Sequence, residues 1–480
     1  MKYATSHWAV LMMGIALISG IASAQNVPPS PDRPWNFSAE RQIHEAKALP
    51  VSRLAIDATK SYSLADLVDF AERNNPLTRV AWEGAKERAA GLRIAQSELY
   101  PVLAAIALSQ VDRANILFGT NFVRQTVAAF GPAVQLDYTM FDFGARSGRI
   151  SAARAELAAA NFSFNDTHRQ IIFQVADTYY RLLNAVGQVA AGEASLENAK
   201  TVQDAAENRL QNGLATLPDV LEARSATAQA EYDLQSARGY EEIARGDLAT
   251  TLGISPTVRI QVQPLDELPA PELHDDSVED LLNRALEQRP DMLQQIAEAD
   301  AREGKVREAR AAYYPSVKFE TSIYGQPLYG WQDQFPPAHV TSMTGAATIR
   351  LDWTIIDGGA RRNNLLSAEA TRREALARVE ATSDQIAEEV WRSYSNVKTS
   401  LRRRDAATAL LQASRQSYIA AVEAYGFGVR SLLDVTAAQR VLAQARSADV
   451  AARTSVLDTL ADLAFRTADL VRLGGPRGNP

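Results

Sequence analysis

The sequence of 480 residues contains no cysteine. This absence excludes disulfides, thiolate chemistry and cysteine-based zinc sites. It also excludes the lipid-modified cysteine that anchors a bacterial lipoprotein, so any attachment to a membrane must come from the fold itself. The histidines are scattered along the chain without the spacing of metal ligands. The sequence therefore predicts no metal site, no cofactor and no enzyme.

Long apolar runs and an excess of positive charge are missing as well. After the first two dozen residues there is no run of about 18 apolar residues, the length that a transmembrane helix needs. Charged residues make up 22% of the chain and the formal net charge is −7, whereas a nucleic-acid-binding protein needs a basic face. Two classes remain: a soluble secreted protein, or one that spans a membrane as a β-barrel, the other backbone arrangement that hydrocarbon tolerates.

Residues 1–24 have the features of a secretory signal peptide. Lys2 precedes an apolar run from Trp8 to Ile21, and Ala22-Ser23-Ala24 supplies the small residues for cleavage. The run is too short and wrongly flanked for a membrane helix, and a retained anchor is the alternative. We expect the mature chain to begin near Gln25, outside the cytoplasm.

The rest of the chain contains one pattern twice. Three dipeptides of the first half have counterparts 214 positions later, and from the middle of the pattern the offset is 215. An offset that holds over such a span indicates an internal duplication. We divide the chain into a leader (25–62), a first repeat (63–252), a proline-rich linker (253–276), a second repeat (277–470) and a tail (471–480). The matching residues are Ser63-Leu64, Asn75-Pro76, Tyr100-Pro101, Asp142, Gly213 and Asp219-Val220 with Ser277-Val278, Arg289-Pro290, Tyr314-Pro315, Asp357, Gly428 and Asp434-Val435.

Each repeat has the same predicted order of elements. A helix comes first and ends before a proline. Two strands follow, joined by a loop, and two long helical tracts complete the repeat. The expected helices are 63–99 and 277–313, the strands 102–111, 127–141, 317–324 and 346–356, and the loops 112–126 and 325–344.

The second strand of each half alternates between apolar and polar residues. Leu136 and Tyr138 flank Asp137, and Leu351 precedes Asp352. Such alternation is typical of a half-buried strand, either in a membrane barrel or in a sheet packed on helices. Four strands cannot close a barrel, because spanning barrels need about eight or more. Open edges would favour aggregation, but three chains with four strands each would close one barrel.

Two tracts, Arg146–Gln211 and Arg361–Phe427, contain no proline, and the first of them places apolar residues three, four or seven positions apart. This spacing predicts a long helix with one apolar seam, about 100 Å in length. Each tract ends at a glycine, where a left-handed cap fits. A hydroxyl residue with an acid three positions later then starts a returning helix about half as long. The punctuating residues are Gly213, Thr216 and Asp219 in the first repeat and Gly428, Ser431 and Asp434 in the second.

This pattern resembles the TolC outer-membrane efflux family over nearly the whole mature chain. The similarity is carried by the glycines at the strand exits and by residues around the two helical tips. It implies a mainly α protein with a membrane β-barrel: a homotrimer whose twelve-stranded barrel lies in the outer membrane above a periplasmic α-helical barrel. The residues are Gly144, Gly358-Gly359, Asn212-Gly213-Leu214, Asp219-Val220, Tyr425, Gly428, Arg430, Asp434 and Val435.

The resemblance also implies partners and a functional site. The partners would be a periplasmic adaptor, an inner-membrane pump and outer-membrane lipid. The periplasmic gate would consist of Tyr425, Arg430, Asp434 and Asp219, with the aspartates around the narrowest pore. The turns in contact with the adaptor would be Asn212, Gly213 and Leu214 and, in the second repeat, Phe427, Gly428 and Val429.

Two positions depart from the family pattern. Ala437 stands where TolC has a second aspartate, which puts a double acidic ring in doubt, and Asn212 replaces the usual valine. Each acid at a helix start also has a simpler role, because it stabilises a capped helix in any protein. Arg430 and Tyr425 could be solvated tip residues. Three copies of Asp434 near a threefold axis would favour cations and raise one another's pKa.

Three functions follow from these observations. The first is the exit duct of a tripartite efflux system that passively conducts small molecules or ions. The second is the same duct in a type I system that secretes a polypeptide. The third, from a different class, is a soluble periplasmic coiled-coil scaffold without a pore.

Overall fold

The computed structural model describes residues 60–265, 277–333 and 335–469. The predictions for the signal peptide, for the leader up to residue 59, for residues 266–276 of the linker and for residues 470–480 lie outside the described residues. Within the described part of the linker, the short strand β4 (Gln261–Val262) pairs in parallel with β1 (Ser61–Tyr62). None of the described helices is apolar and uncharged enough over its length to cross a membrane.

Two helices, rather than the expected one, begin each repeat, so that prediction is wrong. The residue before each break, Asn75 or Arg289, has an extended backbone with ψ of 127° or 125°. The proline that follows clashes with a helical conformation of the preceding residue but suits the first position of a new helix. The chain therefore ends one helix and starts another. The helices are α3 (Leu64–Asn74), α4 (Pro76–Ser97), α7 (Val278–Gln288) and α8 (Pro290–Ala311).

Four antiparallel strands form one sheet in the order β2-β3-β5-β6. The strands are longer than predicted, and the expected loops over 112–126 and 325–344 are wrong. The prediction depended on the alternation of apolar and polar side chains. The hydrogen-bonded pairing of the strands continues beyond the residues that alternate. In the first hairpin only a tight turn at Gly119, with φ of 63°, separates the strands. The bounds are β2 Val102–Phe118, β3 Asn121–Phe141, β5 Ser316–Gln332 and β6 Ala338–Asp352.

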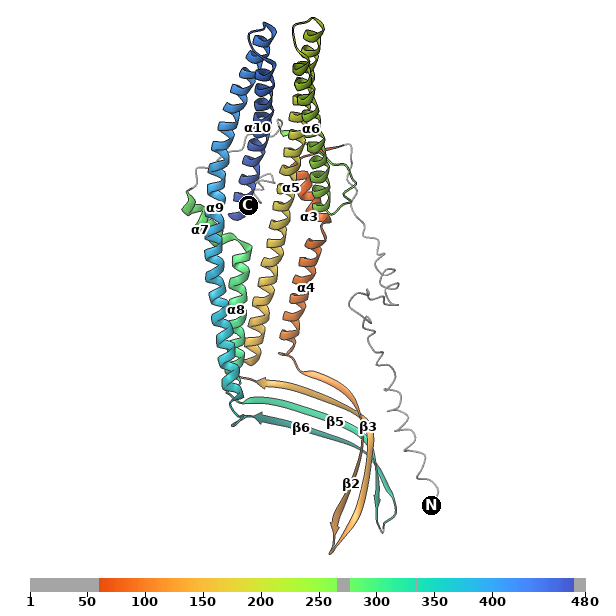
Figure 1. Ribbon diagram of the computed structural model, residues 1–480. Coiled ribbons are helices and arrows are strands. Elements are labelled where there is room, and N and C mark those ends of the chain that lie inside the picture. The colour runs from red at the N-terminus through yellow and green to blue at the C-terminus, as the bar shows by residue number, and fades with distance from the viewer. Residues whose placement is uncertain (1–59, 266–276, 334, 470–480) are drawn as a thin grey trace, which may run out of the picture. The chain divides into compact units, whose positions relative to one another are not determined.

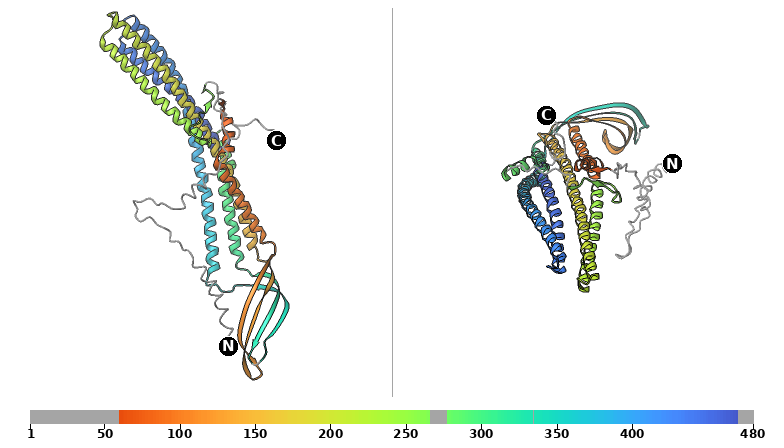
Figure 2. Two further views of the ribbon diagram at one scale, coloured as in Figure 1. Left: turned by 90° about the vertical axis from the view of Figure 1, so that its right-hand side faces the viewer. Right: turned by 90° about the horizontal axis from the view of Figure 1, so that it is seen from above.

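The two long helices and their returning partners are confirmed. Helices α5 (Ala145–Gln211) and α9 (Ala360–Gly426) have 67 residues each. Helices α6 (Leu217–Thr251) and α10 (Leu432–Arg466) have 35 residues each. Figures 1 and 2 show α6 beside α5 and α10 beside α9. The strands lie at the ends of the long helices that are remote from the hairpin turns.

The part of each long helix that lacks a returning partner is covered by the first helices of the two repeats. Helices α3 and α4 pack on α5, α7 packs on α9, and α8 packs on both α5 and α9. In the first repeat, Leu67 of α3, Tyr179 of α5 and Leu248 of α6 share one buried cluster. In the second, Leu281 of α7 and Ile386 of α9 share another. The main cores therefore lie where the returning helices end and the first helices begin.

A network of buried ion pairs joins the second repeat to α5 at this level. The Arg289 side chain is 3% exposed and pairs with Asp291 at 2.6 Å and with Glu389 at 2.8 Å. Arg169 of α5 lies 3.5 Å from Asp291 and donates to the carbonyl oxygen of Phe465 at 2.8 Å. Burial alone would raise the pKa of Asp291, but the hydrogen bond and charge of Arg289 hold that pKa below its usual range. The network fixes the start of α8 and the end of α10 against the long helices.

Helices α5 and α8 approach each other closely at two glycines. A Cβ atom at Gly148 would lie 2.6 Å from the backbone nitrogen of Glu308, and one at Gly304 would lie 2.6 Å from that of Ala152. Backbone atoms cannot move aside as the end of a side chain can. The crossing therefore requires glycine at both positions.

Replacing Gly148 with alanine should push α5 away from α8. Overpacking of this kind costs about 1–3 kcal/mol, so we expect Gly148→Ala to lower the Tm measured by circular dichroism in detergent. Gly84→Ala in α4 is the control, because nothing lies within 4 Å of a Cβ at Gly84 and alanine is the better helix former. If Gly148→Ala unfolds at the temperature of the unchanged protein, the close crossing is wrong.

Candidate functional site

The first tip turn, Asn212, Gly213 and Leu214, ends α5. Gly213 adopts φ of 73°, in the left-handed region where glycine is favoured. The N–H of Leu214 donates to the carbonyl oxygen of Arg209 at 2.8 Å, and the N–H of Gly213 donates to that of Leu210 at 3.0 Å. These bonds satisfy carbonyls that the helix end leaves free.

The second tip turn, Phe427, Gly428 and Val429, ends α9 in the same way. Gly428 adopts φ of 75°. The N–H of Val429 donates to the carbonyl oxygen of Ala424 at 2.9 Å, and the N–H of Gly428 donates to that of Tyr425 at 3.0 Å. The duplication has therefore kept the conformation of the turn, although the residues on either side of the glycine differ.

Asp219 and Asp434 both cap the helix that returns from their tip. The Asp219 carboxylate accepts hydrogen bonds from the N–H and hydroxyl of Thr216 at 2.8 and 2.7 Å. The Asp434 carboxylate accepts the corresponding bonds from Ser431 at 3.1 and 2.9 Å. These bonds hold the pKa of each aspartate below its usual value of 3.8, with smaller contributions from Arg209 and Arg430. Within one chain, the simpler capping role is thus present at both aspartates.

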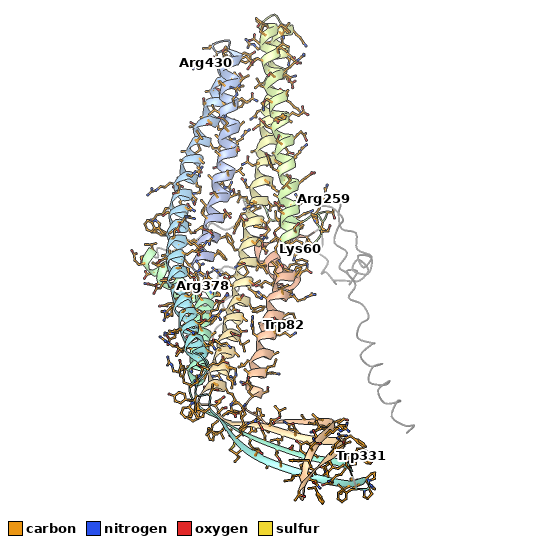
Figure 3. All side chains as sticks on the ribbon, turned by 60° about the horizontal axis from the view of Figure 1, so that its bottom comes forward. Lys60, Trp82, Arg259, Trp331, Arg378 and Arg430 are labelled. Atoms are coloured by element: carbon orange, nitrogen blue, oxygen red, sulfur yellow. The ribbon has the colours of Figure 1, made fainter. Side chains whose placement is uncertain are left out.

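Arg430 and Asp434 lie close together at the start of α10. The Arg430 guanidinium lies 3.4 Å from the Asp434 carboxylate, and the two side chains are 61% and 41% exposed. Figure 3 shows Arg430 at the end of the α9–α10 hairpin. A surface ion pair of this kind contributes little to stability. Because both side chains are in part exposed, both charged groups can also interact with other molecules. Ala437, one turn further along α10, is exposed and carries no charge.

Tyr425 is placed differently from the other predicted gate residues. It is 9% exposed and packs with Val220 of the first hairpin and Val435 of the second. Its hydroxyl is buried without a hydrogen-bond partner among the described residues. Burial raises the pKa of this hydroxyl, and nearby Arg209 partly opposes that effect. Tyr425 therefore belongs to the core that joins the two tips rather than to the solvated surface.

Arg209 is a further residue of the site that the sequence analysis missed. Its guanidinium donates to the carbonyl oxygens of Tyr425 and Gly426 at 2.9 and 3.1 Å and lies 4.7 Å from the centre of the Tyr425 ring. A cation at the C-terminus of a helix is favourable, and here the cation comes from the other hairpin. A basic residue in the last turn before Asn212-Gly213 was visible in the sequence. Its partner across the repeat was not.

Apolar side chains project from both tips. Leu214 is 67% exposed in the first turn, and Phe427 and Val429 are 85% and 79% exposed in the second. Burying large apolar side chains is favourable, so the turns offer a surface for a partner. Within the described ranges, no three His, Asp or Glu side chains come close enough together to hold a metal ion.

Comparison with known proteins identifies the family. The family model for outer membrane efflux proteins matches the chain twice, over residues 67–254 and 281–468. The protein therefore belongs to the outer membrane efflux protein family, and the expected TolC-like fold with its duplicated repeat is confirmed.

Relatives and solved structures agree with this assignment. Outer membrane protein OprJ of Pseudomonas aeruginosa is 24% identical over 433 residues, 88% of each chain. Protein CyaE of Bordetella pertussis is 27% identical over 322 residues, 67% of this chain and 66% of CyaE. The crystal structure of the outer membrane protein VceC from Vibrio cholerae has a TM-score of 0.70 at 22% identity, covering 84% of this chain and 95% of VceC.

Loss of Arg209 should loosen the end of α9. In Arg209→Ala the carbonyls of Tyr425 and Gly426 lose a charged donor worth about 1.5 kcal/mol, so amides in residues 421–428 should exchange hydrogen about tenfold faster. Hydrogen exchange with mass spectrometry measures this. The control is Arg224→Ala, which breaks the exposed pair with Glu207 at 2.9 Å on the same hairpin. Equal exchange in both variants would contradict the role of Arg209.

Proposed function

We propose that three copies of this protein form the outer-membrane exit duct of a tripartite efflux system. The duct passively conducts small molecules or ions from the periplasm to the exterior. Membership of the outer membrane efflux family supports the location and the transport role. The observation that carries the proposal is the four-stranded sheet with two unpaired edges, attached to two long helical hairpins.

The sheet supports assembly with other copies in a membrane. Among the described strands, β2 and β6 each have one edge without a partner. Hydrocarbon does not tolerate free backbone N–H and C=O groups, so these edges must pair. Three copies supply twelve strands, which is within the range of membrane barrels.

One face of the sheet suits contact with lipid. The register places large apolar residues of all four strands on this apolar face, and several are about half exposed or more. Outer-membrane lipid would cover them once the barrel closes. The residues are Leu103, Val134, Leu136, Tyr138, Val317, Phe319, Ile323, Ile349 and Leu351.

The helical tips would form the periplasmic entrance of the duct. Arg430, Asp434 and Asp219 would restrict the pore, while Tyr425 holds the two hairpins of one chain together. The exposed tip turns at Gly213 and Gly428 would contact a periplasmic adaptor, which moves the paired hairpins of each chain away from those of the other copies. Energy would come from the inner-membrane pump. A type I system could use the same duct for a polypeptide, whereas a soluble scaffold has no support from the family.

Single-channel conductance of the detergent-extracted protein in a planar bilayer tests the gate. The unchanged protein should open to a small, cation-selective conductance. The double variant Asp434→Ala with Arg430→Ser removes the ion pair at the tip, and we expect it to conduct more. Ser431→Ala weakens the cap of α10 but keeps the Asp434 charge, and it should conduct as the unchanged protein does. Unchanged conductance of the double variant would mean that the gate is assigned to the wrong residues.

A further inference from the structure

The sheet has a polar face, opposite the apolar face, with an uneven distribution of charge. The register places five charged residues of β3, β5 and β6 on this face close to the helical end of the sheet, and Asp112 of β2 on the same face toward the other end. The next two rows outward carry Gln135, Ser322 and Tyr324 and no charge. The five charges near the helical end therefore form a band across β3, β5 and β6, separate from Asp112. The members of this charged band are Asp137, Lys318, Glu320, Arg350 and Asp352.

Most members of the charged band are paired. Arg350 forms an ion pair with Glu320 and lies 3.5 Å from Asp352. Lys318 lies 3.4 Å from the same Asp352. The four side chains are between 30% and 50% exposed. Ion pairs between exposed groups are weak. The four paired side chains therefore remain in contact with water.

Asp137 is the exception within the band. Its carboxylate accepts hydrogen bonds from Gln135 at 3.0 and 3.1 Å and forms no ion pair with any described residue. It lies directly opposite Glu320 in the ladder, on the same face. Like charges in opposing positions are unfavourable in a sheet, so this arrangement is not explained by stability.

The balance of the band is negative. Three carboxylates against two cations leave one excess negative charge in each chain (3 − 2 = 1). We propose that the charged band is an ion-selecting section of the duct at the membrane end, in which Asp137 favours cations independently of the helical tips. This inference rests on the proposed function, because the polar face becomes the inner wall only when three sheets close into one barrel.

Closure concentrates the effect of Asp137. Three copies would place three unpaired carboxylates around the lumen at one level, in the manner of the acidic rings of cation channels. The field of such a ring extends about one Debye length, roughly 30 Å in 0.01 M salt and 10 Å in 0.1 M salt. The ring would therefore act on the ions that pass the level of Asp137 in the lumen. A cargo that carries positive charge would leave the duct more readily than an anionic one.

The test is the ratio of cation to anion permeability, measured from the reversal potential in a gradient of dilute KCl with the full chain in a planar bilayer. We expect Asp137→Asn to lower the ratio at least twofold, because it removes three unit charges from one level of the lumen. Asp137→Lys should lower it further. Asp137→Glu keeps the charge and should keep the ratio, which controls for altered folding.

Lys318→Gln is the matched control of opposite sign. It neutralises a cation of the same band and should raise the ratio. The changes should persist when Asp434→Asn removes the acid at the tip. An unchanged ratio in both Asp137→Asn and Lys318→Gln would overturn the proposal. A protein that forms no channel before any substitution would instead overturn the proposed function.

Discussion

Four strands that cannot close on themselves are the constraint on which the rest of the structure depends. In the sheet β2-β3-β5-β6 the inner strands β3 and β5 are paired on both sides, whereas one edge of β2 and one of β6 have no partner among the described residues. In water such edges favour aggregation, and in hydrocarbon unpaired backbone groups are not tolerated. The proposed assembly with other copies would resolve both problems. In that trimer, the curvature of the closed barrel would turn the apolar face toward lipid and the charged band toward the lumen.

The duplication also determines how the long helices are covered by other helices. Each repeat supplies two strands and one hairpin, so that closing the proposed barrel of three chains would also arrange six hairpins around one axis. The long helices α5 and α9 need partners over their whole length, and two short elements share that task in each repeat. The returning helix covers the tip half and the first helices cover the other half, with the buried network around Arg289 at their junction. Arg209 and Tyr425 then join the two tips of one chain, which would make the hairpins of a protomer move together.

Much of this fold could be predicted from the sequence, because the strongest signals are periodic. The alternation of apolar and polar side chains around Asp137 predicted which residues lie on each face of the sheet. The absence of proline from residue 146 onward correctly predicted the long helix α5. The breaks at Asn75 and Arg289 were missed, although each is followed by a proline that restarts a helix within the same apolar pattern. The outer halves of the strands were missed because their ladder does not depend on alternation. Arg209 could not be found, since its contact with Tyr425 spans 216 residues and depends on how the two hairpins align. The assignments of Asp434 and Arg430 to a gate remain predictions.

Disulfide cross-linking between the two free edges of the sheet tests the central claim most directly. The chain contains no cysteine, so any cross-link must come from the substituted positions. Ala104→Cys in β2 would be combined in turn with Ala346→Cys, Thr348→Cys or Arg350→Cys in β6, and oxidised in whole cells. Because an antiparallel pair of strands brings Cβ atoms within reach of a disulfide, the account predicts at least one combination that yields a covalent trimer and nothing larger. Monomers in every combination, or an open series of larger species, would contradict the closed three-chain barrel.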